Sequence, residues 1–185
     1  MSESAAAVPG LARPGQATAT WAAPDARRLL QLGLAAIWLL DGVLQYQSFM
    51  FSHGFAQMLA QSAAGNPAVI AHPITWAAGI VAHHPVPTNA AFATIQLLLG
   101  LGIALRPTIR AALAASIVWS VAVWWFGEGL GGVLSGGASP LDGAPGAVIL
   151  YALLAVLVWP RAGGRDRGAP FVAAGATGVR VAWVL

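Results

Sequence analysis

The chain of 185 residues contains no cysteine and no lysine, and only 8% of its residues are charged. Without cysteine it cannot form disulfides, thiolate metal sites, CxxC redox motifs or covalent haem attachments, and no iron–sulfur site is evident. A soluble domain carries about 25% charged residues, so this composition, 58% hydrophobic, excludes an ordinary soluble domain. The net charge of +3 does not indicate nucleic-acid binding, because the arginines flank apolar runs and no nucleic-acid motif accompanies them.

Four apolar runs predict four membrane-spanning helices, at about 29–47, 88–105, 108–126 and 144–160. A helix over the first run would be roughly 28 Å long, enough to cross a hydrocarbon core. Arginines precede the first run, separate the second from the third and follow the fourth, at positions 27, 28, 106, 110, 161, 165 and 167. Because arginine-rich short loops stay cytoplasmic, we expect an all-α, multi-pass bundle in the plasma membrane with both termini cytoplasmic.

The segments outside the four runs are assigned by composition. Residues 1–26 have no apolar core of a signal peptide and are expected to form a disordered cytoplasmic leader. Residues 162–185 are expected to form a cytoplasmic tail. Residues 48–87 lie on the outer side and hold two apolar pieces, Phe49–Ala64 and Val69–Ala82. The second is too short to span and Pro73 interrupts it, so both are expected to be short interfacial helices that cap the bundle.

Asp41 is the most informative single residue, because it lies inside the first apolar run. A carboxylate there persists only where it faces protein or water. Gln45 is four residues further on and shares its helix face. Asp41 is therefore either a proton-active or ligand-binding carboxylate, or an interhelical hydrogen-bonding group that fixes packing.

Polar residues also occur in the second and third runs. Asn89 and Gln96 are two helical turns apart and either line a pocket or serve packing. Ser116 and Ser120, with Ala112 one turn earlier, form a small-residue stripe of the kind that lets helices approach closely.

Glu128 follows the third run within a tryptophan- and glycine-rich segment. A carboxylate held below Trp124 and Trp125 would be partly desolvated, which suits a proton acceptor or donor; the alternative is an exposed loop acid. The glycine pattern that begins at Gly127 follows a membrane helix rather than a strand and indicates no nucleotide site. Asp41 and Glu128 are the proton-active candidates, Gln45, Asn89 and Gln96 would orient a ligand, and Trp38, Trp124 and Trp125 would wall its pocket.

All four histidines fall in the outer segment, at His53, His72, His83 and His84. Imidazoles with carboxylates can bind zinc or copper, but the spacing matches no ligand motif. They are weak metal candidates, and ordinary interfacial histidines are the alternative.

Three features of the sequence belong together: four short spans, a polar and glycine-containing end of the first span, and the stretch Asn89-Ala-Ala-Phe92-x-x-x-Gln96-Leu-Leu-Leu-Gly100. In these features the chain resembles the DoxX-like superfamily of small four-helix membrane proteins. This group includes the DoxD subunit of thiosulfate:quinone oxidoreductase. The resemblance covers about residues 29–160 and implies quinone-linked redox or redox-accessory work; the long segment 48–87 departs from the compact pattern.

Two functional hypotheses of different classes follow. The first is a redox or redox-accessory subunit that holds a quinone in an outer-facing pocket, beside a membrane-protein partner or in a homodimer. The second is a non-enzymatic membrane binding or assembly module, with outer-face copper or zinc handling as a further alternative. In both hypotheses the lipid bilayer is an expected partner, and whether the chain is an enzyme is left open.

Overall fold

A computed structural model describes residues 25–136 and 138–160. This part of the chain is all-helical and has no strand, which confirms the all-α prediction. Of the expected leader only residues 25 and 26 are described, as the N-cap and first residue of the first helix, and the expected tail lies outside the described residues. Arg13, Arg161, Arg165, Arg167 and Arg180 are also outside them. The helices are α1 (Ala26–Leu44), α2 (His53–Gln61), α3 (Ala68–His83), α4 (Pro85–Ala104), α5 (Ile109–Phe126) and α6 (Ala147–Leu157), with short 3-10 turns at Ser48–Phe51, Gly129–Gly132 and Pro140–Asp142.

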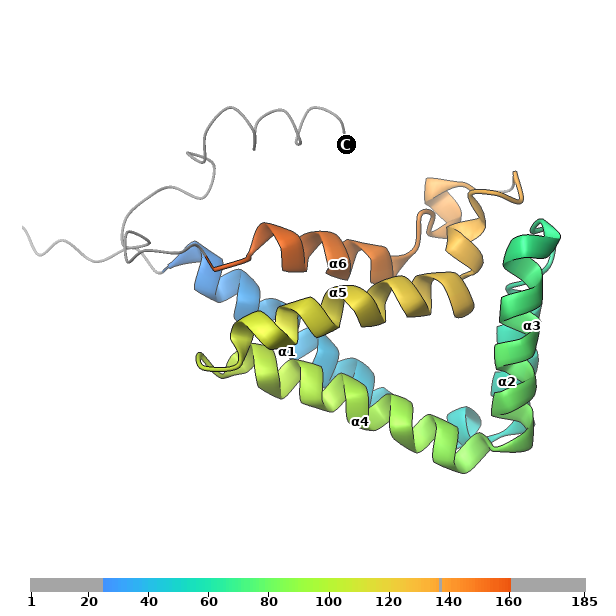
Figure 1. Ribbon diagram of the computed structural model, residues 1–185, viewed down its shortest axis with the longest axis horizontal. Helices are drawn as coiled ribbons and strands as arrows, with labels where there is room; N and C mark the ends of the chain where they lie inside the picture. Colours follow the sequence, from blue (N-terminus) through green and yellow to red (C-terminus); the bar gives the residue numbers. More distant parts are fainter. Residues whose placement is uncertain (1–24, 137, 161–185) are drawn as a thin grey trace, which may run out of the picture.

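Four of the helices form a bundle, and the other two lie across one of its ends (Figure 1). Helix α1 packs against α4, α4 against α5, α5 against α6, and α6 returns to α1, which closes the ring. Helices α2 and α3 pack on each other, and α3 also contacts α4 and α5. We call this covered end the cap end.

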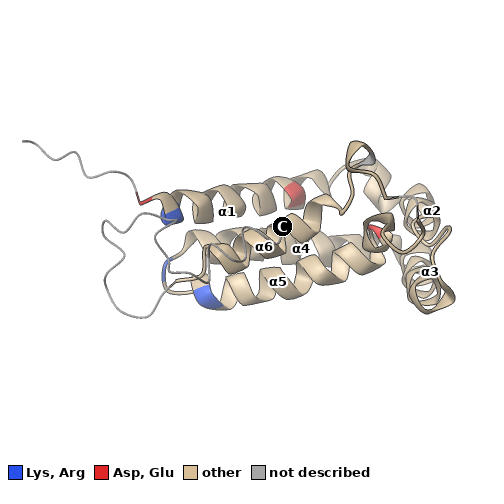
Figure 2. Cartoon of the chain, turned by 90° about the horizontal axis from the view of Figure 1, so that it is seen from above, with Lys and Arg blue, Asp and Glu red and all other residues tan. Residues whose placement is uncertain are grey.

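The opposite end carries the arginines of the described residues, and we call it the arginine end (Figure 2). There the Arg28 guanidinium donates to the carbonyls of Ile103 and Ala104, at the C-terminus of α4. The Gln31 amide donates to the Val158 carbonyl at the end of α6, at 2.9 Å. Cations and donors at helix C-termini satisfy carbonyls that have no partner within the helix, so the start of α1 ties two other helices together.

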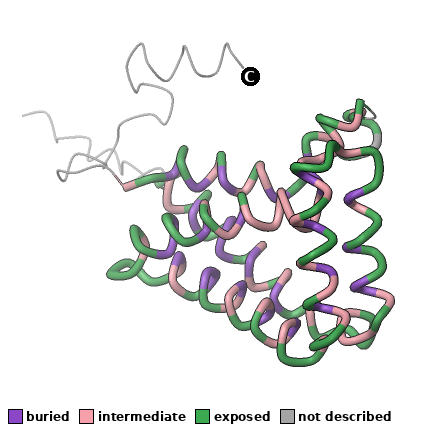
Figure 3. Tube along the Cα trace, turned by 45° about the vertical axis from the view of Figure 1, so that its right-hand side comes forward, coloured by how far each residue is buried: buried purple, intermediate pink, exposed green. Residues whose placement is uncertain are grey.

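The core of the bundle is built around Trp38 of α1. Its side chain is 1% exposed, and its indole N–H donates to the Ser116 hydroxyl of α5 at 2.8 Å. Its ring meets Tyr151 of α6 edge-on, with centroids 5.2 Å apart. Buried positions recur on the inward side of each bundle helix, and exposed ones lie outside (Figure 3). The small-residue stripe Ala112, Ser116 and Ser120 is buried, as expected for a packing face.

Two helices, α4 and α5, are long and apolar enough to cross a membrane, by length and composition; α3 and α6 are shorter apolar helices. Helix α3 differs from the expectation, because it runs through Pro73 without a break. Pro73 is the sixth residue of α3, beyond the first turn, so the helix continues without the bond that an amide there would make to the Val69 carbonyl. Helix α6 begins at Ala147, so Pro145 precedes it rather than occupying its first turn.

Candidate functional site

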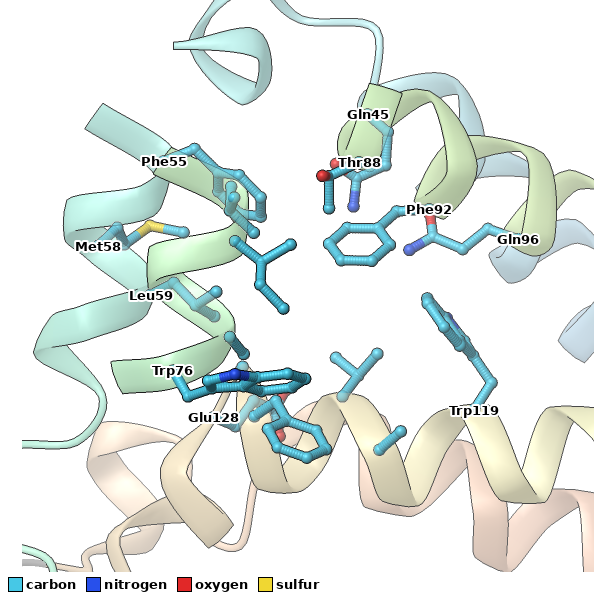
Figure 4. A pocket seen from close by; sticks show the side chains of 17 residues that line it. Gln45, Phe55, Met58, Leu59, Trp76, Thr88, Phe92, Gln96, Trp119 and Glu128 are labelled. Carbon is cyan, nitrogen blue, oxygen red and sulfur yellow. The ribbon is translucent and has the colours of Figure 1, made fainter. Parts of the chain in front are cut away.

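A cavity of about 430 Å³ lies at the cap end, where α2 and α3 meet α4 and α5 (Figure 4). Its walls are largely apolar, and its aromatic side chains are Phe55, Trp76, Phe92, Trp119 and Phe126. Phe92 and Trp119 meet edge-on, with ring centroids 5.5 Å apart. This volume falls within the range of about 300–1,000 Å³ that is usual for small-molecule sites.

The face that α5 turns to the cavity consists of Trp119, Ala122, Val123 and Phe126. These positions follow the i, i+3, i+4, i+7 spacing of a single helix face. Trp38, Trp124 and Trp125, which were predicted to wall a ligand pocket, are not among the residues that line this cavity.

Those three tryptophans lie elsewhere for a simple geometric reason. Trp124 and Trp125 follow Val123 by one and two positions, which turns them away from the cavity face. Trp124 packs towards the bundle core, and Trp125 packs beside Ile70 and Ile74 of α3. Trp38 is at the centre of the bundle.

Four polar atoms at the cavity are buried and have no hydrogen-bond partner among the described residues. They are Gln45 Oε1, Gln96 Oε1, Trp119 Nε1 and Glu128 Oε2. Gln96 is only 6% exposed, and Figure 4 shows it and Trp119 on one side of the cavity with Glu128 on the other. An unpaired buried polar group costs about 1–3 kcal/mol, so these four groups favour a ligand that supplies the missing partners.

Asn89 is buried beside the cavity but does not line it. Its side chain is 0% exposed and its amide donates to the Gln45 backbone carbonyl at 2.7 Å. That carbonyl lies just beyond the end of α1, so Asn89 caps α1 and holds Gln45 at the cavity. The structure thus makes Asn89 a positioning residue and brings Gln45 and Gln96 to the site.

Glu128 joins the cavity to the start of α6. Its Oε1 accepts from the Val148 amide at 3.4 Å, and the Ala147 amide also bonds to the carboxylate. Burial raises the pKa of Glu128, and these two amide bonds lower it by a smaller amount. Gly146 packs directly against Oε2. The carboxylate therefore holds the start of α6 with both oxygens, while the residue itself forms part of the cavity lining.

Asp41 does not line the cavity, although it shares α1 with Gln45. Its half-buried carboxylate bonds to the Tyr151 phenol of α6. Tyr151 also experiences the charge of Glu128. The two acids proposed as proton-active thus have a common neighbour, but only Glu128 faces the cavity. The contact across to α6 favours the interhelical interpretation of Asp41.

The four histidines are all exposed. Although α3 continues from His72 to His83, no group of three histidine, aspartate or glutamate side chains in residues 25–136 and 138–160 is placed to hold a metal ion. One His83 ring nitrogen bonds to the Gly79 carbonyl at 2.7 Å. The structure does not bring the weak metal candidates together.

Comparison with protein-family models, curated proteins and solved structures finds no match for this chain.

Proposed function

We propose that the chain is a four-span membrane protein with its cap end outside and its arginine end in the cytoplasm. The bundle helices support this proposal, because their outward faces are apolar, as their inward faces are. Exposed positions include Leu98 and Leu101 on α4, Val118 on α5, and Leu150 and Val156 on α6. A helix that is hydrophobic all round belongs in a large core or a bilayer.

The distribution of charge supports the orientation. Arginines gather at one end of the bundle (Figure 2): Arg27 and Arg28 are at the start of α1, and Arg106 and Arg110 are where α4 leads into α5. Asp25 is also at the start of α1, whereas Asp41 is in the last turn of α1 and Glu128 follows the end of α5, towards the cap end. Short arginine-bearing loops remain cytoplasmic.

Helix α6 has 11 residues, or roughly 16 Å, so irregular chain must complete its crossing. Non-helical backbone at membrane depth requires partners within the protein. At the cap end these partners are present, since the Trp124 indole donates to the Pro145 carbonyl and Glu128 accepts from the Val148 amide.

The absence of native cysteine makes the topology directly testable. We expect Gln47→Cys, at the cap end, to react with a membrane-impermeant maleimide in intact cells. Pro107→Cys, at the arginine end, should react only after permeabilisation. Both positions are exposed, so the side of the membrane decides the result. Equal labelling of both variants in intact cells would refute the four-span orientation.

We further propose that the cavity binds a lipophilic molecule with a quinone-type head group, as an accessory subunit of a membrane redox system would. The observation that carries this is the pair of unpartnered buried groups, Gln96 Oε1 and Trp119 Nε1, in an otherwise apolar aromatic cavity. A quinone ring fits aromatic walls, and its oxygens could accept hydrogen bonds from the Trp119 N–H and the Gln96 amide NH2. Gln96 Oε1 can only accept, so its partner would be the hydroxyl of the reduced quinol form. The resemblance to DoxX-like proteins points to the same ligand class.

The cavity mouth favours entry from lipid. Three side chains at its edge are both apolar and exposed, namely Met58 of α2 and Trp76 and Ile80 of α3, with Trp76 67% exposed. An apolar rim beside a bilayer would accept the tail of a lipophilic molecule while the head group enters the cavity. In this proposal the chain binds and orients the head group, and a membrane partner exchanges electrons with it.

Removing the Trp119 indole N–H tests the ligand proposal. We expect Trp119→Phe to weaken binding of a decyl-tailed benzoquinone by roughly three- to tenfold, the effect of one neutral hydrogen bond. Calorimetric titration of purified protein in mild detergent measures it. Trp125→Phe is the matched control, because the Trp125 N–H is also buried and unpartnered but lies away from the cavity. Absence of binding to the wild type would instead favour the assembly-module alternative.

A further inference from the structure

Helix α4 carries three cavity-lining side chains in a row. Thr88, Phe92 and Gln96 follow one another at four-residue intervals within Pro85–Ala104, and all three line the cavity. Four residues are close to one helical turn, so the three side chains lie along one side of α4, with about 12 Å of helix rise between the first and the last. The row therefore has a polar group at each end and an aromatic ring between them (Figure 4).

The end of the row nearer the centre of the bundle, which we call the inner end, is polar on two helices. Gln96 of α4 is only 6% exposed, and its Oε1 has no partner among the described residues. Trp119 of α5 has a buried, unpartnered indole N–H, and its ring meets Phe92 edge-on. An indole can only donate, so this end suits a ligand oxygen that accepts.

The end of the row nearer the cap, which we call the outer end, is formed by Thr88 with Gln45 of α1. The Asn89 amide, next to Thr88 in the chain, donates to the Gln45 backbone carbonyl at 2.7 Å. This bond holds the end of α1 beside the first turns of α4, and Figure 4 shows the Gln45 and Thr88 side chains together. Gln45 Oε1 is buried without a partner. The amide and the hydroxyl can each donate or accept, so this end suits either a carbonyl or a hydroxyl.

The distance between the two ends matches one ring with oxygens at opposite positions. Such a six-membered ring, with a hydrogen bond at each oxygen, reaches on the order of 11 Å. This is comparable with the rise of roughly 12 Å between Thr88 and Gln96, and the long glutamine side chains at both ends adjust the reach. Two oxygens at adjacent positions would both face one end, and a single oxygen reaches only one.

We infer that the cavity selects ring head groups with oxygens at opposite positions, and that Gln45 and Thr88 hold the second oxygen. This specificity rests on the proposed quinone-type site. Trp119 and Gln96 hold the inner oxygen, the ring lies along Phe92, and the outer oxygen bonds to the Thr88 hydroxyl or the Gln45 amide. A ring with one oxygen, or with two adjacent oxygens, leaves the outer end without a partner.

The test compares three probes with the same decyl tail: a para-hydroquinone, a catechol and a phenol. Each is titrated calorimetrically, without oxygen, into the full chain in mild detergent. We expect the wild type to bind the hydroquinone about three- to tenfold more tightly than the catechol or the phenol, the effect of one further neutral hydrogen bond. Equal binding of all three probes would overturn the selection for opposite oxygens. Binding of none of them would instead overturn the proposed ligand class.

Combining Thr88→Val with Gln45→Leu removes both partners at the outer end. This variant should bind the hydroquinone about three- to tenfold more weakly and the phenol as well as the wild type does, because the one oxygen of the phenol is held at the inner end. Thr88→Val alone, which keeps the shape of the side chain, should show part of the effect. Thr94→Val is the matched control, because the Thr94 hydroxyl bonds to the Ala90 carbonyl of its own helix and lies outside the cavity lining. Unchanged hydroquinone binding by the combined variant and by Thr88→Val, or equal losses for hydroquinone and phenol, would overturn the assignment of the outer end.

Discussion

Replacing Gly146 with alanine is expected to destabilise the protein by about 2 kcal/mol or more and to weaken ligand binding. Gly146 has φ 109° and ψ 145°, a conformation that side chains rarely adopt. An added Cβ would also overlap Glu128 Oε2 and approach Trp124 Cδ1 to 3.1 Å. The carboxylate would be pushed away from the start of α6, and this would disturb the part of the cavity wall that Glu128 forms.

Gly143→Ala is the matched control for that prediction. Gly143 also has a positive φ, 93°, but an added Cβ there meets nothing within 4 Å. It should carry the backbone strain without the collision. The two variants are compared by their unfolding free energies in mild detergent. Gly146→Ala should cost less stability in a protein that also carries Glu128→Ala, because the colliding carboxylate is gone. Equal costs for Gly146→Ala and Gly143→Ala, with additive effects of Glu128→Ala, would show that Glu128 does not pack on Gly146.

Replacing Gly100 with leucine is expected to lower the unfolding free energy by about 3 kcal/mol or more, because it forces α1 and α4 apart. A Cβ at Gly100 would lie 2.6 Å from Leu39 Cγ and 2.9 Å from the Ala35 carbonyl oxygen. The first contact can rotate away, but the second is backbone. Gly42 of α1 lies similarly close to α4, because a Cβ added there would be 3.1 Å from the Leu97 backbone nitrogen.

Gly33→Leu provides the comparison on the same pair of helices. An added Cβ at Gly33 meets nothing within 4 Å, and leucine has a higher helix propensity than glycine by nearly 1 kcal/mol. This variant should be neutral or slightly stabilising. Thermal unfolding in detergent and the yield of folded protein measure both. Similar stabilities for Gly100→Leu and Gly33→Leu would contradict the close approach of α1 and α4.

The sequence predicts the helices better than it predicts which way they face. Helices over the first three apolar runs could be foreseen because each of these runs is long and free of breaks, and α5 begins and ends within one residue of its predicted bounds. However, α5 is apolar on every side, so its sequence does not indicate which face turns inward. For that reason the sequence does not distinguish Trp124 and Trp125 from Trp119, the tryptophan of α5 that lines this cavity.

Contacts between distant segments account for the other differences. The start of α6 was placed too early because its cap is Glu128, from about twenty residues earlier, rather than a local residue. The bond between Asp41 and Tyr151 joins α1 to α6, and no local pattern indicates it. By contrast, Gln45, Gln96 and Glu128 were found as candidates because polar side chains in apolar surroundings are conspicuous in the sequence itself.

The most direct test of the central claim is mass spectrometry of small molecules that co-purify with the wild-type protein in mild detergent. A cavity of about 430 Å³ with four unpartnered buried polar atoms should retain a lipophilic quinone or quinol, near one molecule per chain. Gln96→Leu, which removes a cavity amide that is 94% buried, should retain much less. A wild type that carries no such molecule, or one that Gln96→Leu retains equally well, would contradict the assignment of this cavity as a quinone-type site.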